Sequence, residues 1–565
     1  IINWCPRCLT ALSDIEVEHS DDAGELVSIR YGEGDSEIIV ATTRAETMLG
    51  DTAVAVNPDD ERYTHMIGKT VKVPLIDREI PIVADEHVDA AFGTGAVKVT
   101  PAHDPNDFEI GLRHNLENLV ILDADAKVVN TNSAFDGMDR YEARKAVVEA
   151  LRAEGRIVAE KRPYIHAVGH CSRCDTTVEP RLSKQWFVKV APLAKAAGDA
   201  VRDGRVKIEP EELAPRYFEW IDNMHDWCIS RQLWWGHRIP VWYGPNGEVI
   251  VVGPGETAPA GYEQDPDVLD TWFSSWLWPI SVFNGLTQPN NPEINYYYPT
   301  NDLVTAPEIM FFWVARMAIA GYEYMGQQPF KNVYYTGIVR DKLGRKMSKS
   351  LGNSPDPIDQ INQYGADGVR VGVLISSPAG NDLPFDSSQC EQGRNFTNKI
   401  WNAYRLVSSW EVQEIEQPLS SKVAISWFDN RFAQVLSEIN SNFDKFRISD
   451  ALMSTYKLVW DDFCSWYLEM IKPGYQQPID RQTIEHTLDF FERILKIMHP
   501  FTPFVAEELY HALRERQTGD DIVIAQWPVS QEVNVLPLQQ FAFNEKVITQ
   551  IRNIRKQNNI ATKVK

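Results

Sequence analysis

The sequence has no long hydrophobic run. No stretch approaches the roughly eighteen consecutive apolar residues that a membrane-spanning helix requires. The first residues, Ile1 to Cys5, have neither the basic start nor the apolar segment of a secretory signal. Export and membrane insertion are therefore unsupported, and we expect a cytoplasmic protein without a membrane partner.

Cysteine is scarce, with seven residues in the whole chain. Four of them form two Cys-x-x-Cys pairs, Cys5 with Cys8 and Cys171 with Cys174. In a cytosolic protein this spacing favours metal binding or redox chemistry over structural disulfides. The other three cysteines have no such pattern, and we assign them no role.

Basic residues are outnumbered by acidic ones, 56 to 79, which leaves a formal net charge of −23. This balance excludes a protein covered by basic surface, although a nucleic-acid partner requires only a local basic track. Candidate tracks are Lys342 to Lys349 and Arg552 to Lys556. Solvated loops on an acidic protein explain both equally well, so charge alone leaves the partner open.

The chain is long enough for several packed domains, and its residue pattern changes along its length. Residues 25–165 contain short β-prone runs, such as 96–100, broken by Gly, Asp and Pro. Between about 180 and 385, strand-like segments alternate with helical ones such as 309–320, which is typical of a parallel α/β sheet. Beyond about 395, apolar residues recur at a spacing of three and four, which indicates a helical bundle.

The most specific motif is the pentapeptide Lys346-Met347-Ser348-Lys349-Ser350. Lysines on a glycine-flanked loop can close over a polyphosphate and neutralise the charge that develops as pyrophosphate leaves. A loop rich in Lys and Ser is, by itself, most often only exposed to solvent. The pentapeptide nevertheless resembles, letter for letter, the signature loop of class I aminoacyl-tRNA synthetases. That resemblance implies ATP with Mg²⁺, and contacts from Lys346 and Lys349 to the ATP phosphates.

The two cysteine pairs each have the spacing of a zinc knuckle, and together they supply the four thiolates of a closed structural zinc site. Two unrelated reduced pairs are the alternative, because the pairs lie far apart in sequence. The arrangement resembles the cysteine-rich neck of valyl-type class I synthetases, where the intervening insert is an editing domain. This resemblance implies a structural Zn²⁺ held by Cys5, Cys8, Cys171 and Cys174.

Two segments of the β-rich part, 42–47 and 93–107, combine threonines, cations and two carboxylates three residues apart. Such groups can hold a ribose and an α-ammonium while positioning a water molecule. The alternative is ordinary β-strand threonine and an Asp-Pro turn. Both segments are similar to the editing pocket of the branched-chain synthetases, and Lys98 follows the valyl pattern where the isoleucyl pattern has histidine.

The resemblance also implies individual roles. Asp107 should bind the amino group of the misattached residue, and Asp104 should recognise the threonine hydroxyl. Ala45 departs from the family pattern, which has proline there. A hydrophobic valine pocket cannot strongly reject an isostere that adds a hydroxyl, so the family needs a second, hydrolytic site. The residues expected to shape that site and grip the tRNA terminus are Thr42, Thr43, Arg44, Phe92 and Lys98.

The synthetic pocket is suggested by two strings that contain tryptophan, residues 230–240 and 267–275. Large rigid indoles can wall a small aliphatic side chain, although most tryptophans are simply core residues. The strings resemble valyl rather than isoleucyl or leucyl synthetases, which implies that Trp235 and Trp272 line a site for L-valine. Residues 305–317 resemble the family's nucleoside-binding strand and helix. There Glu308 should take the ribose hydroxyls, with Ala306 in place of the expected glycine.

The expected fold is multidomain α/β and α. A partial Rossmann-like class I catalytic domain carries an inserted, mainly β editing domain, and a helical-bundle anticodon-binding domain follows. The implied activity is ATP-dependent ligation of L-valine to the tRNA for valine through valyl-adenylate, with hydrolysis of mischarged threonyl-tRNA, by a monomer. The expected segments are a zinc-knuckle neck (1–24), the editing insert (25–165), the second half of the catalytic domain (166–390), the anticodon-binding domain (391–537) and the basic start of a linker (538–565).

The family's His-x-Gly-His signature does not occur in this sequence, and residues 65–68 are a chance near match. We therefore expect a fragment that lacks the first catalytic half and a C-terminal coiled-coil arm, and that cannot activate valine alone.

Three alternatives stay open. The first is an isoleucyl- or leucyl-type ligase. The second is a free-standing editing hydrolase, which would need only residues 25–165 and would leave the Lys346–Ser350 loop without a use. The third is a nucleic-acid-binding module with a structural zinc.

Overall fold

The computed structural model describes residues 1–348, 351–375, 377 and 380–561. No helix in this part of the chain is long and apolar enough to cross a membrane. The chain forms two compact units, so the expected catalytic segment, 166–390, is divided between them. The first unit comprises Ile1–Arg205, Arg216–Thr300 and Met310–Pro329, and the second comprises Val206–Pro215, Asn301–Ile309 and Phe330–Lys565.

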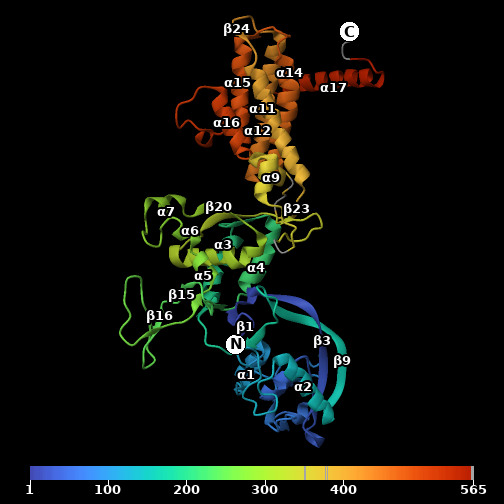
Figure 1. Cartoon of the computed structure of the whole chain (residues 1–565), viewed down its shortest axis with the longest axis vertical. Helices are drawn as coiled ribbons and strands as arrows, with labels where there is room; N and C mark the ends of the chain where they lie inside the picture. The colour runs from blue at the N-terminus through green and yellow to red at the C-terminus, as the bar shows by residue number, and fades with distance from the viewer. Residues whose placement is uncertain (349–350, 376, 378–379, 562–565) are drawn as a thin grey trace. The chain divides into compact units, whose positions relative to one another are not determined.

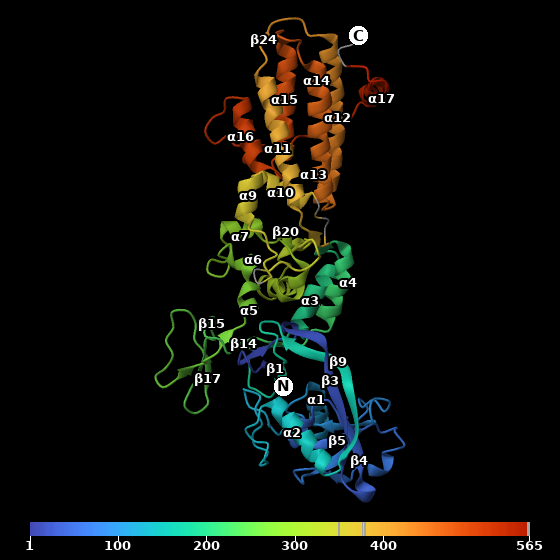
Figure 2. The same cartoon turned by 45° about the vertical axis from the view of Figure 1, so that its right-hand side comes forward.

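The first unit begins with a small sheet, here called the neck sheet, of order β10-β1-β2. Its strands are β1 (Ile2–Cys5), β2 (Thr10–Leu12) and β10 (Glu179–Arg181). From this sheet runs an antiparallel ribbon of two fifteen-residue strands, β3 (Val17–Tyr31) and β9 (Ile157–Cys171), which lie side by side in Figures 1 and 2. The expected boundaries at 24/25 and 165/166 both fall inside these continuous strands.

The insert at the far end of the ribbon is mainly β, as predicted. β4 (Ile38–Thr42) extends the ribbon, and a second sheet of order β6-β7-β5-β8 packs beside it. Its strands are β5 (Ala53–Val56), β6 (Thr70–Lys72), β7 (Glu79–Ala84) and β8 (Ala96–Val99). Its helices are α1 (Pro105–His114) and α2 (Arg140–Ala153).

Strand β5 explains how the insert is layered. Its sequence alternates alanine and valine, and all four residues are buried. Val54 and Val56 join the large core shared with α2, whereas Ala53 and Ala55 face the smaller core that contains Ile110 of α1. Because successive side chains of a strand point to opposite faces, this one strand separates the two helices.

The rest of the first unit consists of short elements. Its helices are α3 (Ala191–Arg202), α4 (Ala214–Asp222), α5 (Thr271–Ser275), α6 (Trp278–Ser281), α7 (Pro292–Tyr297) and α8 (Ala315–Ala320). Its strands are β11 (Phe187–Val188), β13 (Trp227–Cys228), β14 (Ser230–Arg231), β15 (His237–Arg238), β16 (Val241–Tyr243), β17 (Val249–Val251), β18 (Glu263–Gln264) and β19 (Val268–Leu269). The helix predicted over 309–320 is present, with a π-helical turn at Met310–Val314 before α8.

The second unit contains the remaining α/β elements. Its central sheet has the order β12-β21-β20, and β12 runs parallel to β21. Helices α9 and α10 follow the signature loop, and Gly365 separates them because its φ of 77° lies outside the helical region. These elements are β12 (Lys207–Glu209), β20 (Thr300–Thr305), β21 (Phe330–Tyr335), β22 (Val339–Arg340), β23 (Leu383–Pro384), α9 (Pro357–Tyr364) and α10 (Ala366–Leu374).

The predicted helical bundle follows, and the fold class is confirmed. Phe428 lies at its centre, with ring centroids 5.0 Å from those of Tyr467 and Phe490. Two short strands, β24 (Val412–Gln413) and β25 (Ile479–Asp480), pair at one end. The bundle helices are α11 (Ser387–Ser408), α12 (Leu419–Asp444), α13 (Ile448–Lys457), α14 (Leu468–Ile471), α15 (Arg481–Met498) and α16 (Pro503–Leu513).

The last helix, α17 (Val535–Gln557), occupies most of the segment expected to be a linker. Its Phe541 ring stacks on Trp427 of α12 at 3.8 Å, and Leu538 also packs against the bundle core. The expected boundary at 537/538 therefore falls inside a helix, because these apolar side chains continue the bundle.

Candidate functional site

The four predicted metal ligands come together. The turn after β1 carries Cys5 and Cys8, and the turn after β9 begins with Cys171 and contains Cys174. The four sulfur atoms lie within 4.8 Å of one another, and Cys174 Sγ is 3.5 Å from both Cys5 Sγ and Cys8 Sγ. A tetrahedral zinc with Zn–S bonds of about 2.3 Å requires S–S distances of about 3.8 Å. The donor set therefore fits a structural Zn²⁺, located where both ribbon strands meet the neck sheet.

The two predicted editing carboxylates lie at the start of α1. Asp104 is the N-cap, and its carboxylate accepts hydrogen bonds from the backbone N–H groups of Asn106 and Asp107. Pro105 at the first helical position fits this geometry because it has no N–H to satisfy. Asp107 is buried, and its carboxylate accepts a 2.8 Å hydrogen bond from the Thr100 N–H at the end of β8.

Asp107 lies in the first turn of α1, but its burial makes a negative charge there unfavourable. Burial, and then the neighbouring carboxylate of Asp104, raise its pKa to about 7, against the opposing effects of Lys98 and the Thr100 N–H. A carboxylic acid that titrates near neutrality in a pocket is typical of a functional position. A cationic group that reached Asp107 would favour its ionised form.

Lys98 lies beneath this position rather than extending into solvent. Its ammonium is 3.2 Å from Asp51 Oδ1 and donates to Thr100 Oγ1 at 2.7 Å. Asp51 is completely buried and also accepts hydrogen bonds from Thr100 Oγ1 and the Tyr31 hydroxyl, both at 2.7 Å. The lysine is thus one member of a closed polar network that supports the segment leading to Asp107.

Arg44 is held by buried acids. Its guanidinium donates to Glu179 of β10 and to the His103 carbonyl oxygen, the latter at 2.9 Å, and lies 3.6 Å from Glu46. Burial opposes its charge, but Glu179 and Glu46 outweigh burial and raise the pKa of Arg44. Glu46 in turn receives two 2.7 Å hydrogen bonds from Arg144 of α2.

The remaining residues predicted for the editing site are Thr42, Thr43 and Phe92. Thr42 Oγ1 accepts a hydrogen bond from the Arg44 N–H and closes the turn after β4. Thr43 lines a groove of about 630 Å³ with Ala45 and Arg144. Phe92 is 58% exposed, so its ring is available to an incoming molecule.

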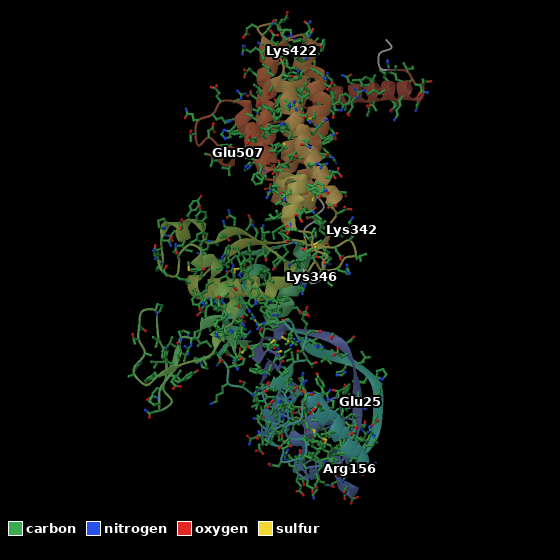
Figure 3. All side chains as sticks on the ribbon, in the orientation of Figure 1. Glu25, Arg156, Lys342, Lys346, Lys422 and Glu507 are labelled. Atoms are coloured by element: carbon green, nitrogen blue, oxygen red, sulfur yellow. The ribbon has the colours of Figure 1, made fainter. Side chains whose placement is uncertain are left out.

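The signature loop lies in the second unit. Lys346, which is labelled in Figure 3, is largely exposed. Its ammonium is 3.6 Å from the carboxylate of Glu308, which follows the carboxyl end of β20. Met347 and Ser348 are half-buried. The structure thus brings Lys346 and Glu308 together, and their roles at a nucleotide stay a prediction. Lys349 and Ser350 lie outside the described residues.

Two residues not singled out from the sequence shape this loop. Asp341 accepts hydrogen bonds from the Leu343 and Arg345 N–H groups and from Asn353 Nδ2. These bonds, the one from Asn353 above all, hold the pKa of Asp341 below its usual range. Asn353 also accepts from the Ser348 N–H at 2.9 Å, so the loop is closed across its base.

The two tryptophans predicted to line the amino-acid site occupy different surroundings in the first unit. Trp272 lies on α5, with its ring centroid 5.3 Å from that of Phe312. Trp235 is 84% exposed and lies beside Trp234. Nothing in the described residues joins Trp235 to Trp272, and the role of both remains a prediction.

Sequence reasoning missed the buried acids Asp51, Glu46 and Glu179. Asp51 and Glu46 flank the threonine segment, so proximity in sequence could have indicated them. Glu179 is distant in sequence from these segments, and nothing in the sequence around it, other than the Pro180-Arg181 that follows, sets it apart.

Comparisons with known proteins agree with these observations. The family described as tRNA synthetases class I (I, L, M and V) matches residues 1–258 and 256–386, and the anticodon-binding domain of tRNA ligase matches residues 426–565, which include α17. The valine–tRNA ligase of Christiangramia forsetii is 51% identical over 582 residues, covering 100% of this chain and 66% of that protein. That of Streptomyces avermitilis is 52% identical over 567 residues, covering 98% of this chain and 64% of that protein. The chain thus spans slightly less than two thirds of the length of these relatives.

Proposed function

Since this chain belongs to the class I tRNA synthetases, we propose that it carries the editing, loop-closing and tRNA-binding parts of a valine–tRNA ligase. The whole enzyme would join L-valine to its tRNA with ATP and Mg²⁺, in the cytoplasm and as a monomer. The observation that carries this proposal is the identity of about half of all positions, over the full chain, with relatives of that name.

In ligation, the second unit would act on the nucleotide. Lys346 is paired with Glu308 across the end of β20, and both side chains are exposed enough to meet a ligand. We propose that Glu308 accepts hydrogen bonds from the ribose hydroxyls while Lys346 moves to the phosphates. There the positive charge of Lys346 would stabilise the departing pyrophosphate. The bundle would bind the tRNA, consistent with its match to anticodon-binding domains.

In editing, the insert would hydrolyse threonyl-tRNA for valine. Asp107 would bind the α-ammonium of the threonyl group. Asp104, the N-cap of the same helix, would accept a hydrogen bond from the threonine hydroxyl. Arg44, Thr42, Thr43 and Phe92 would hold the tRNA terminus above them. The support is that Asp104 and Asp107 lie together at the N-terminus of α1, where Arg44 binds the preceding His103 carbonyl oxygen, and that the buried Asp107 carboxyl has a pKa of about 7, which matches a task at neutral pH.

The cysteine site would be structural. Four thiolates fill the coordination sphere of Zn²⁺, so no position remains for substrate. The metal would fix the two turns at which the ribbon strands join the neck sheet, and its role would be to hold the insert in place.

The decisive assay is ATP-independent deacylation of threonyl-tRNA for valine by the 565-residue chain. We expect hydrolysis of threonyl-tRNA and not of valyl-tRNA, with loss of activity in Asp107→Ala. Absence of hydrolysis would reject the editing proposal, and hydrolysis of valyl-tRNA for isoleucine instead would support the isoleucyl alternative. We also expect no valine-dependent pyrophosphate exchange, because this sequence contains no His-x-Gly-His motif.

The free-standing hydrolase of residues 25–165 is disfavoured by one observation. Arg44 donates to Glu179 and the His103 ring contacts the Pro180 carbonyl, so the pocket uses residues outside that range.

A further inference from the structure

Glu179 is a buried acid of the neck sheet that reaches the proposed editing pocket. It lies on β10, opposite Trp4 of β1, and is 2% exposed. One carboxylate oxygen accepts from Arg44, and the other accepts from Arg140 at 2.9 Å. Arg140, the first residue of α2, also donates to the Thr177 carbonyl oxygen beside β10. Two guanidinium groups of the insert therefore share one carboxylate that the insert does not supply.

The contact continues from Glu179 to the editing carboxylates. The Arg44 guanidinium donates to the His103 carbonyl oxygen, and His103 immediately precedes the N-cap Asp104. The His103 ring is also fixed, because its Nε2 accepts a 2.9 Å hydrogen bond from the Ile121 N–H. Burial, and then Arg44, lower the pKa of His103 to about 3, so the ring is neutral. The backbone that begins α1 is thus held by Arg44, and the His103 side chain next to it is held by the Ile121 N–H.

Glu46 is a weaker partner of Arg44 than Glu179 is. Both oxygens of Glu46 already accept a hydrogen bond from Arg144, and its nearest approach to Arg44, 3.6 Å, is an ion pair without a hydrogen bond. Loss of the Glu179 charge would leave Arg44 and Arg140 close together with no shared counter-ion in a buried place, which is strongly unfavourable. Arg44 would then turn away from His103.

We propose that Glu179 is a positioning residue of the editing site: it fixes Arg44, and through Arg44 the start of α1, so that Asp104 and Asp107 keep their arrangement. The proposal rests on the proposed editing function. It assigns to the neck sheet, beyond the attachment of the insert, a part in aligning the hydrolytic pocket.

A double-mutant cycle on the full chain tests whether Glu179 acts through Arg44. Glu179→Gln keeps the size of the side chain and removes its charge. We expect kcat/KM for threonyl-tRNA deacylation to fall about tenfold or more, the size of coupling seen within one ion network. Arg44→Ala should lower it as well, and adding Glu179→Gln to Arg44→Ala should cause no further loss.

Three matched variants separate this role from general stability. Arg140→Met removes the other guanidinium and leaves Glu179 to Arg44, so we expect deacylation to fall less than in Glu179→Gln, because Arg44 keeps its charged partner and its hydrogen bond to the His103 carbonyl oxygen. Asp265→Asn removes another buried acid of the same unit, bonded to Trp186 and Tyr243, and should leave deacylation unchanged. Glu179→Asp keeps the charge and should retain more activity than Glu179→Gln. Zinc content and thermal unfolding are measured for every variant.

The outcomes discriminate. If Asp107→Ala and Arg44→Ala leave deacylation intact, the editing function itself is wrong. If they abolish it while Glu179→Gln has no effect, or if the Glu179→Gln loss adds in full to that of Arg44→Ala, the positioning role is wrong. If Glu179→Gln does not fold, a Glu179→Asp variant that folds and is as inactive as Arg44→Ala would contradict the proposal, and one that retains activity would support it.

Discussion

Replacing Asp107 by asparagine should stabilise the insert while abolishing its proposed activity. The carboxyl is 8% exposed and lies beside Asp104, and its pKa of about 7 means that ionisation at neutral pH is unfavourable in the folded chain. Asparagine keeps an oxygen that can accept from the Thr100 N–H and never ionises. It also loses the charge that would bind an α-ammonium.

The magnitude follows from linkage. Raising a pKa from 3.8 to about 7 costs on the order of 4 kcal/mol once the group is fully ionised, at about 1.4 kcal/mol per unit. Because the folded pKa is the higher one, this cost is absent below pH 3.8, grows as pH rises and is complete above pH 7. At pH 5 it is about 2 kcal/mol by the same calculation. Asp107→Asn should therefore gain about 2 kcal/mol more at pH 8 than at pH 5.

Local hydrogen exchange is the suitable assay, because a chain of several domains does not unfold in two states. The opening free energy of peptides that span β8 and α1 is compared between the parent chain and Asp107→Asn at both pH values. Asp85→Asn is the matched control. Asp85 is equally buried and binds Arg113 and His114 of the same helix, which outweigh burial and lower its pKa. This control should destabilise the same peptides, and a gain for Asp107→Asn that is independent of pH would refute the reasoning.

Three further predictions concern neighbouring features. Asp104→Asn keeps an N-cap side chain but removes a like charge, so the pKa of Asp107 should fall. The pH profile of threonyl-tRNA deacylation, corrected for spontaneous hydrolysis, should therefore move to lower pH. An unmoved profile would show that Asp104 does not act on Asp107. Chelation, or Cys5→Ser, should release about one Zn²⁺ per chain and reduce hydrogen-exchange protection in the neck sheet but not in the bundle; full retention of metal in Cys5→Ser would reject the four-cysteine site. Gly393→Ala should destabilise the contact between α10 and α11 by about 1–3 kcal/mol, because a Cβ there would lie 2.3 Å from the Gly368 carbonyl oxygen. Asn398→Ala on the exposed side of α11 is its control in chemical denaturation.

Much of the fold could be predicted from local pattern. The β-prone run 96–100 located β8, and apolar spacing located the bundle. The limits of the insert could not be found in this way, because β3 and β9 read as ordinary polar strands whose partners are more than a hundred residues away. The extension of the bundle into α17 was missed because its few buried contacts, made by Leu538 and Phe541, are sparse within a basic segment.

The site was predictable where a motif names its residues. The four predicted cysteines lie together, and the two predicted carboxylates lie together at the start of α1. Lys346 and Glu308, each predicted to bind a different part of ATP, lie beside each other, and their roles stay predictions. Their counter-ions were not predictable. Asp51 and Glu179 are single acids with no surrounding pattern, and only three-dimensional packing reveals that Lys98 and Arg44 are bound to them. A motif identifies the side chains that would contact a ligand, but it does not identify the buried acids that hold those side chains in place.

The ribbon of β3 and β9 has a consequence for how such an insert can change in length. Fifteen residues in each strand span about 50 Å, and a bulge between Gly24 and Leu26 separates an exposed half from a half that packs in the insert. Removing one residue from one strand would reverse the faces of everything beyond it. Removing two from each strand would preserve both faces and shorten the ribbon by about 7 Å. The ribbon can therefore change its length only by two residues per strand at a time, and each such change would have to keep the contacts of Glu179 with Arg44 and Arg140 that join the neck sheet to the pocket.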